Sequence, residues 1–103
     1  MRTLSIAILI AASALQAADS SAGKAVYEKH CMSCHGGNGA APANVAKFVE
    51  GRMVDLRSSR IQSMSSADMT KVLTTGKGKM KATPAVPVAQ VDNLTAYIHE
   101  LKG

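Results

Sequence analysis

Aromatic residues and cysteines are scarce in this sequence. The 103 residues include one Phe, two Tyr, no Trp and only two cysteines, Cys31 and Cys34. A disulfide that closes so short a loop removes little entropy from the unfolded chain, which excludes a disulfide-stapled domain. Aromatic side chains are the usual source of buried area in a small core. The composition therefore favours a bound group that adds apolar mass to the fold.

Long hydrophobic runs are also absent, except near the N-terminus. A positively charged start is followed by a nearly continuous apolar run over residues 4–15 and by small residues up to Ala18. This pattern predicts a secretory signal peptide over residues 1–18, cleaved after Ala17 or Ala18. The run is shorter than the roughly 20 residues of a membrane-spanning helix, although an uncleaved leader that anchors the chain is an alternative. One exported domain, residues 19–103, is then expected, in the periplasm of a bacterium.

Acidic residues are the minority among the charges. Twelve Lys and Arg stand against seven Asp and Glu, and loss of the leader removes one Arg, which leaves a formal charge of +4. This charge favours partner proteins with acidic surfaces. Nucleic acid is excluded as a partner because the chain is exported and has no basic patch interleaved with aromatics.

Alternation typical of strands is not seen, and the helical periodicities predict an all-α protein. The last predicted helix has the clearest apolar stripe, and Ser65 or Ser66 is expected to cap the helix before it. The first predicted helix spans residues 22–31 and is capped at Ser20-Ser21, and a short turn is expected at residues 45–48. The next helix spans residues 66–75, with Met69, Val72 and Leu73 facing inward. The last spans residues 89–101, and its apolar face consists of Val91, Leu94, Tyr97, Ile98 and Leu101.

The run Cys31-Met32-Ser33-Cys34-His35 is a C-x-x-C-H motif, which predicts covalent attachment of one haem c. Two cysteines three apart at a helix end project to one side, where they form thioethers with the haem vinyl groups. His35 is then placed to ligate the iron. A redox dithiol needs a βαβ setting, and a zinc site needs more ligands than this chain offers. Of the other histidines, His30 is expected to face away from His35 and His99 to lie at the surface.

Met80 is the predicted sixth ligand of the iron. It lies in the polar run Gly76-Lys77-Gly78-Lys79-Met80-Lys81, which we expect to be a flexible loop where a methionine has no packing role. A thioether opposite a histidine raises the haem potential. Met64 is the second choice for the sixth ligand. The alternative role of this residue is to fill a gap in the core, as methionines often do.

These motifs resemble those of class I bacterial cytochromes c over the whole of residues 19–103. The resemblance implies a cytochrome c fold with three to four helices around one covalently bound haem. It also implies that Gly23 and Tyr97 lie where the first and last helices cross, and that the Pro42 carbonyl accepts a bond from His35. Lys81 follows the methionine where the family often has proline, and Ala40-Ala41 replace glycines.

With His35 and Met80 both on the iron, the expected function is one-electron transfer in a respiratory or oxidoreductase chain, not catalysis. The expected protein is a monomer that meets redox partner proteins and touches a membrane only through a partner or its leader. Lys77, Lys79 and Lys81 either form a docking patch or keep a loop soluble. The alternatives are a haem subunit of a larger redox complex and a five-coordinate haem protein that binds gas or reduces peroxide.

Overall fold

The computed structural model describes residues 18–49 and 54–101, and this part of the chain contains six α-helices, one 3₁₀ helix and no strand. The all-α prediction is confirmed. Three helices have 10 or 11 residues, and three have only four to six. The three long helices correspond to the helices that the sequence predicts, and the short ones raise the number above the expected three to four. The helices are α1 (Ser20–His30), α2 (Met32–His35), α3 (Ala43–Phe48), α4 (Ser59–Gln62), α5 (Ser66–Thr75) and α6 (Val91–Glu100), and the 3₁₀ helix η1 is Val88–Gln90.

The predicted leader, residues 1–18, lies outside the described residues except for Ala18. None of the helices in the described ranges has both the length and the apolar character needed to cross a bilayer.

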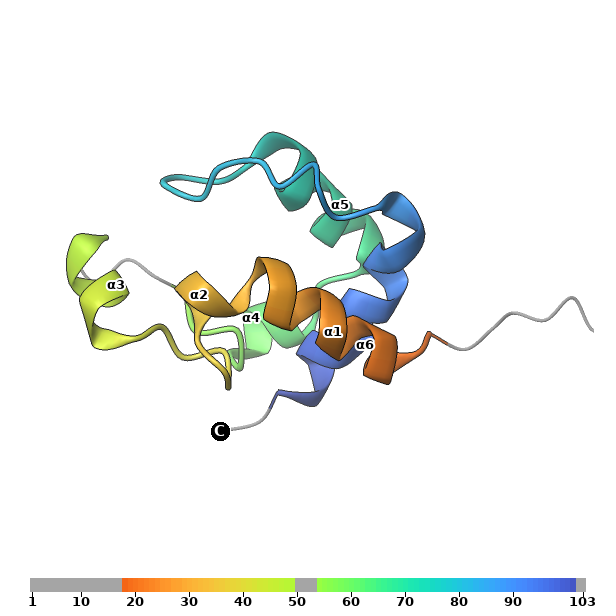
Figure 1. Cartoon of the computed structure of the whole chain (residues 1–103), viewed down its shortest axis with the longest axis horizontal. Helices are drawn as coiled ribbons and strands as arrows, with labels where there is room; N and C mark the ends of the chain where they lie inside the picture. Colours follow the sequence, from red (N-terminus) through yellow and green to blue (C-terminus); the bar gives the residue numbers. More distant parts are fainter. Residues whose placement is uncertain (1–17, 50–53, 102–103) are drawn as a thin grey trace, which may run out of the picture.

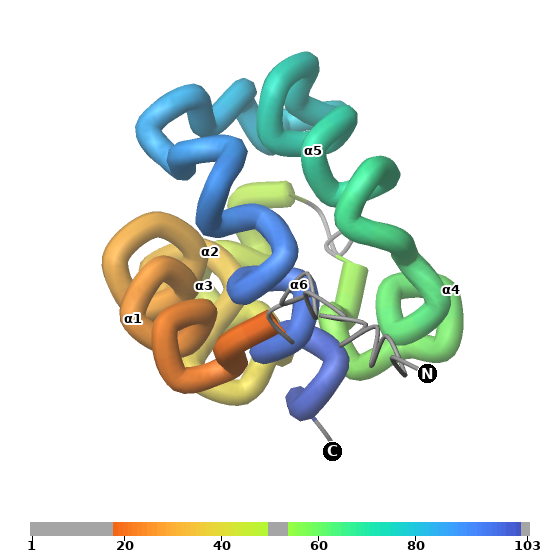
Figure 2. Tube along the Cα trace, turned by 90° about the vertical axis from the view of Figure 1, so that its right-hand side faces the viewer, coloured from red at the N-terminus to blue at the C-terminus, as the bar shows by residue number. Residues whose placement is uncertain are grey.

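The two terminal helices of the domain cross and pack against each other (Figures 1 and 2). Gly23 of α1 lies directly against the backbone of α6, where a Cβ would be only 1.9 Å from the carbonyl oxygen of Asn93. Tyr97, one turn further along α6, instead pairs with Tyr27 of α1, with ring centroids 5.3 Å apart. The crossing and the place of Gly23 in it therefore agree with the resemblance.

The hydrophobic core lies between α1, α5 and α6, and the segment around α4 closes it. Tyr27 and Leu94 are fully buried at its centre. Tyr97, expected on the inner face of the last helix, is only half-buried, whereas the other four residues of that stripe are buried. The buried hydrophobic residues are Tyr27, Leu56, Ile61, Met69, Leu73, Val86, Val91, Leu94, Ile98 and Leu101.

Helix α5 has the boundaries and the cap that its sequence predicts. The Ser65 hydroxyl accepts from the Asp68 backbone N–H at 3.1 Å, and the Asp68 carboxylate accepts from the Ser65 backbone N–H at 3.2 Å. This reciprocal pair satisfies two N–H groups at the helix start. The predicted cap of α1 is wrong: its N-cap is Asp19, whose carboxylate accepts from the backbone N–H groups of Ser21 and Ala22.

Residues 54–62 form a wall of the domain and contain the short helix α4, which has no counterpart in the prediction. Gln62 holds this segment in place, because its side-chain amide donates to the carbonyls of Leu56 and Ile98, each at 2.9 Å. One amide thus ties α4 to α6. Helix α3 begins at Ala43, two residues earlier than the predicted turn.

Candidate functional site

A break in the first helix positions the C-x-x-C-H motif. Helix α1 ends at His30, Cys31 leaves the helical conformation with φ −120°, and α2 resumes with the remaining four residues of the motif. The Tyr27 hydroxyl donates to the carbonyl oxygen of Gly36 at 2.6 Å in the interior. The residue directly after His35 is therefore tied to the core by a buried hydrogen bond.

The motif opens onto a large cavity of about 950 Å³. Ligand pockets typically have about 300–1,000 Å³, so this cavity suits a large planar cofactor. Cys31, Cys34, His35 and Met80 all line it, so the structure brings four of the five predicted site residues together. The apolar part of the lining comes from Val45, Phe48, Val49, Val54, Leu56, Ile61, Met64, Met69, Val72, Leu73, Leu94 and Ile98.

The two cysteines are free thiols at the cavity wall. Cys31 is half-buried and Cys34 is exposed. Burial, and then the proximity of Cys34, raise the pKa of the Cys31 thiol to about 11. A redox-active dithiol needs a lowered thiol pKa, because the thiolate is the nucleophile. The environment of Cys31 therefore disfavours redox chemistry by the dithiol.

His35 stands at the end of α2 with its ring half-buried in the cavity wall. Burial lowers the pKa of its imidazole, which favours the neutral ring that binds metals. Its Nδ1 atom is buried and has no hydrogen-bond partner among the described residues. Buried polar atoms are nearly always paired in native proteins, so this nitrogen lacks a partner such as the one that the resemblance assigns to it, the Pro42 carbonyl.

Pro42 lies close to the motif, since a Cβ on Gly36 would be 3.6 Å from the proline ring, but it does not make the hydrogen bond that the resemblance implies. Its carbonyl oxygen accepts from the backbone N–H of Ala46 at 2.9 Å and so opens helix α3. It is also not among the residues that line the cavity. Since Nδ1 of His35 has no hydrogen-bond partner among the described residues, the expected bond from His35 to the Pro42 carbonyl is not formed in this structure.

Met80 lies in a tight hairpin, not in a loose loop. The backbones of Lys77 and Met80 exchange two hydrogen bonds, of 2.8 and 2.9 Å. Gly76 has φ +73°, and a Cβ there would lie 2.6 Å from the Met80 carbonyl oxygen, so the hairpin folds back closely over this glycine. Met80 also packs against the hydrophobic core. The expectation that this methionine has no packing role is therefore wrong.

Two other residues that could ligate an iron, Met64 and His30, also line the cavity. Met64, the second choice for the sixth ligand, lines the cavity and packs against the core as Met80 does. His30 also lines the cavity, which corrects the expectation that it faces away from His35. The sequence does not reveal this, because the break at Cys31 interrupts the regular helical period between His30 and His35.

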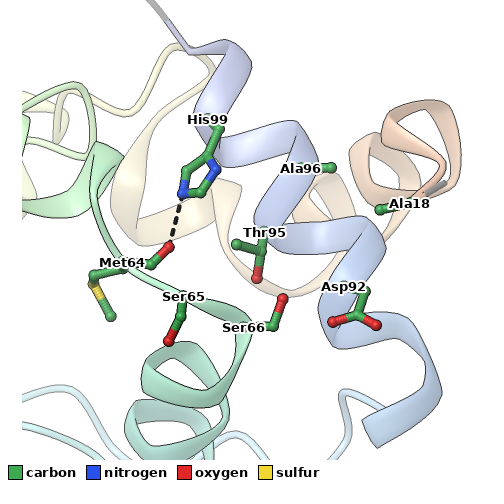
Figure 3. Close-up of a pocket in the computed structure, with 8 residues that line it drawn as sticks. All are labelled: Ala18, Met64, Ser65, Ser66, Asp92, Thr95, Ala96 and His99. Atoms are coloured by element: carbon green, nitrogen blue, oxygen red, sulfur yellow. Dashed lines mark hydrogen bonds between the residues drawn. The ribbon is translucent and has the colours of Figure 1, made fainter.

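His99 is separated from this cavity. Its Nε2 lies 2.9 Å from the carbonyl oxygen of Met64, in a shallow pocket of about 300 Å³ (Figure 3). The ring is half-buried, whereas a surface position was expected. Its contact joins α6 to the start of α5 and leaves His99 outside the set of cavity residues.

Sequence analysis alone misses the contribution of residues 54–61 to the site. Val54, Leu56 and Ile61 add apolar surface to the cavity, and Arg60 adds a cation to its lining. The only signal is the apolar character of these three positions, since the segment is too short to show a helical period. The site thus fits a haem on three observations: the cavity size, its apolar lining and the presence of Cys31, Cys34 and His35 in its wall.

Comparisons with known proteins agree with this site. The family model described as cytochrome c oxidase, cbb3-type, subunit III, matches residues 18–98. The solved structure of KustC0563 c-type cytochrome has the same fold, with a TM-score of 0.62 and 18% sequence identity. The similarity covers 79% of this chain and 98% of that one. No curated protein sequence gave a significant match. The chain therefore belongs to this family and is a small class I c-type cytochrome with one covalently attached haem c.

Proposed function

We propose that this cytochrome is a one-electron carrier in which His35 and Met80 ligate the haem iron and Cys31 and Cys34 hold the haem by thioethers. The observation that carries the proposal is that these four side chains, from segments far apart in the sequence, line one cavity. The bound haem supplies reversible electron transfer between ferric and ferrous iron.

The protein residues have two tasks in this function. His35 and Met80 together leave no position on the iron for a substrate, which disfavours oxygen activation and peroxidase chemistry. The apolar lining excludes water from the site and keeps its surroundings similar in both oxidation states. A site that changes little between oxidation states exchanges electrons with a docked partner without rearrangement.

The carrier acts in the periplasm, after removal of the leader, in a respiratory or other oxidoreductase chain. Lys71, Lys77, Lys79 and Lys81 are exposed and line the cavity, so cations gather where the haem would be closest to a partner. Such charge steers a partner with an acidic surface. The rate of electron exchange with an acidic redox partner is then expected to fall as ionic strength rises.

The visible spectrum of the oxidised and reduced holoprotein tests the ligation. A weak methionine-to-iron band in the far red that disappears in Met80→Ala supports the closed site. A band that persists in Met80→Ala but is lost in Met64→Ala assigns the ligand to Met64. If the wild type has covalent haem but no such band, and its reduced form binds carbon monoxide without denaturation, the five-coordinate alternative holds and the carrier function fails.

The second candidate function is that of a haem subunit in a larger redox complex. The observation in favour of this role is the description of the matching family model, which is that of an oxidase subunit. Stable co-purification with other subunits from native membranes supports it, because carriers form only weak and transient complexes. Recovery of the cytochrome free of partners in the soluble periplasmic fraction contradicts it.

A further inference from the structure

Helix α3 is weakly held to the rest of the domain. It has six residues, none of them buried, and it packs extensively against none of the other helices in the described ranges. Its last residue, Phe48, keeps 70% of its surface exposed although it lines the cavity. An exposed aromatic side chain at the edge of a cofactor cavity needs a contact that fixes its position.

One side chain of the Met80 hairpin makes that contact. The Lys79 ammonium donates to the carbonyl oxygen of Phe48 at 3.2 Å. The same nitrogen lies 4.7 Å from the centroid of the Phe48 ring, within the range of a cation–π interaction. The carbonyl is one of the last in α3 and has no donor from its own helix, so the lysine caps the helix end as well.

This contact spans the mouth of the cavity. In Figure 1 the loop that follows α5 extends toward the side of the molecule on which α3 lies. Phe48 and Lys79 are both exposed and both line the cavity, and Lys79 directly precedes Met80 in the hairpin. Among the described residues, the bond from Lys79 is the one side-chain hydrogen bond that joins α3 to another element.

We infer that the contact between Lys79 and Phe48 is a clasp that retains Met80 in the cavity and so protects the sixth position of the iron. The inference rests on the proposed ligation by Met80. When the contact between Lys79 and Phe48 opens, the hairpin is no longer held on that side, and Met80 then leaves the sixth position of the iron more often. Lys79 and Phe48 are positioning residues: neither touches the iron, and both act through Met80.

Imidazole binding to the oxidised holoprotein measures this retention, because an external ligand binds only while the methionine is away. A cation–π contact at an exposed site corresponds to a change of about two- to fivefold, and loss of the hydrogen bond adds to it. We therefore expect imidazole affinity to rise about three- to tenfold in Lys79→Gln. Phe48→Leu keeps the carbonyl and the apolar bulk and is expected to give a smaller rise.

Lys77→Gln is the matched control. It removes the same charge from the same hairpin, and among the described residues the Lys77 side chain makes no hydrogen bond, ion pair or cation–π contact of the kind that Lys79 makes. Its imidazole affinity should equal that of the wild type. The double variant Lys79→Gln/Phe48→Leu should bind imidazole no more tightly than Lys79→Gln alone, because both changes break one contact.

Equal affinities in Lys79→Gln and Lys77→Gln overturn the clasp while the far-red band of the wild type still supports ligation by Met80. Absence of that band in the wild type overturns both proposals. The measurement is made far from denaturing conditions, so a general loss of stability does not produce the expected pattern. The clasp is supported only if Lys79→Gln and Phe48→Leu raise the affinity and the control does not.

Discussion

The crossing of α1 and α6 leaves no room for a side chain at position 23. A Cβ on Gly23 would lie 1.9 Å from the Asn93 carbonyl oxygen, 2.5 Å from the Asn93 carbonyl carbon and 3.0 Å from the Leu94 nitrogen. These are backbone atoms, which cannot rotate aside as a side chain would. Gly23→Ala therefore forces the two helices apart at the contact on which the fold depends.

Two opposite effects decide the free energy of unfolding of Gly23→Ala. Alanine is the better helix former and would stabilise an isolated α1 by about 1 kcal/mol. Overpacking costs about 1–3 kcal/mol, and contact with backbone places this site at the upper end, near 3 kcal/mol. The net expectation is a loss of about 2 kcal/mol, or roughly a thirtyfold decrease in the folding equilibrium constant.

Guanidinium denaturation of the holoprotein, followed by far-ultraviolet circular dichroism, measures this loss. With a slope of about 2 kcal/mol per molar for a small domain, the midpoint should fall by about 1 M. Gly37→Ala is the control, because the nearest atom to a Cβ there is the Met32 sulfur at 3.9 Å. It should change stability by less than about 0.5 kcal/mol. A Gly23→Ala protein as stable as the wild type, or more stable, would refute the close approach of the helices.

Three further variants test other parts of the structure. Tyr27→Phe removes the shorter of two hydrogen bonds to the Gly36 carbonyl, which keeps the Gly39 N–H at 3.4 Å, and should cost about 0.5–1.5 kcal/mol in denaturation; an unchanged midpoint contradicts the bond. Ser65→Ala breaks the capping box of α5 and should cost about 1 kcal/mol, and an unchanged midpoint would argue against the cap. Hydrogen bonds from the Arg57 side chain, and then from its backbone N–H, lower the pKa of Asp55 to about 2, so the stabilisation they provide is present above about pH 4 and is lost as pH falls toward 2. In NMR titrations, Arg57→Gln should raise this pKa only part of the way to its ordinary value, because the backbone N–H still donates to Asp55, and an unmoved midpoint excludes the side-chain pair.

Local signals predict the longer helices well. Helix α5 is bounded by a serine cap with an aspartate three residues later and by a glycine, all within its own sequence. The start of α1 is different, because Asp19, Ser20 and Ser21 are all good caps. The structure selects Asp19, whose backbone N–H donates to the Asn93 side chain of α6 at 2.8 Å. A contact between distant segments thus settles a choice that local propensity leaves open.

The short elements were not predictable for a related reason. Helix α4 has four residues, which is scarcely one turn, and no periodicity can be recognised over so short a segment. Its position depends on Gln62, whose amide bridges to the carbonyl of Ile98. The packing of Met80 against the core was missed because glycines and lysines surround it, and these suggest a loose loop, whereas the hairpin over Gly76 is compact.

The sequence by itself determined the haem attachment and the helical class. The attachment motif is contiguous, so its chemistry depends on five neighbouring residues, and the helices follow from caps and apolar periods. Only the tertiary structure decided which residues share the cavity with His35, that Pro42 opens α3 instead of meeting His35, and that Lys79 reaches Phe48. The shared cavity and the contact of Lys79 with Phe48 join segments that are far apart in the chain, and no local signal in the sequence reports which of them meet.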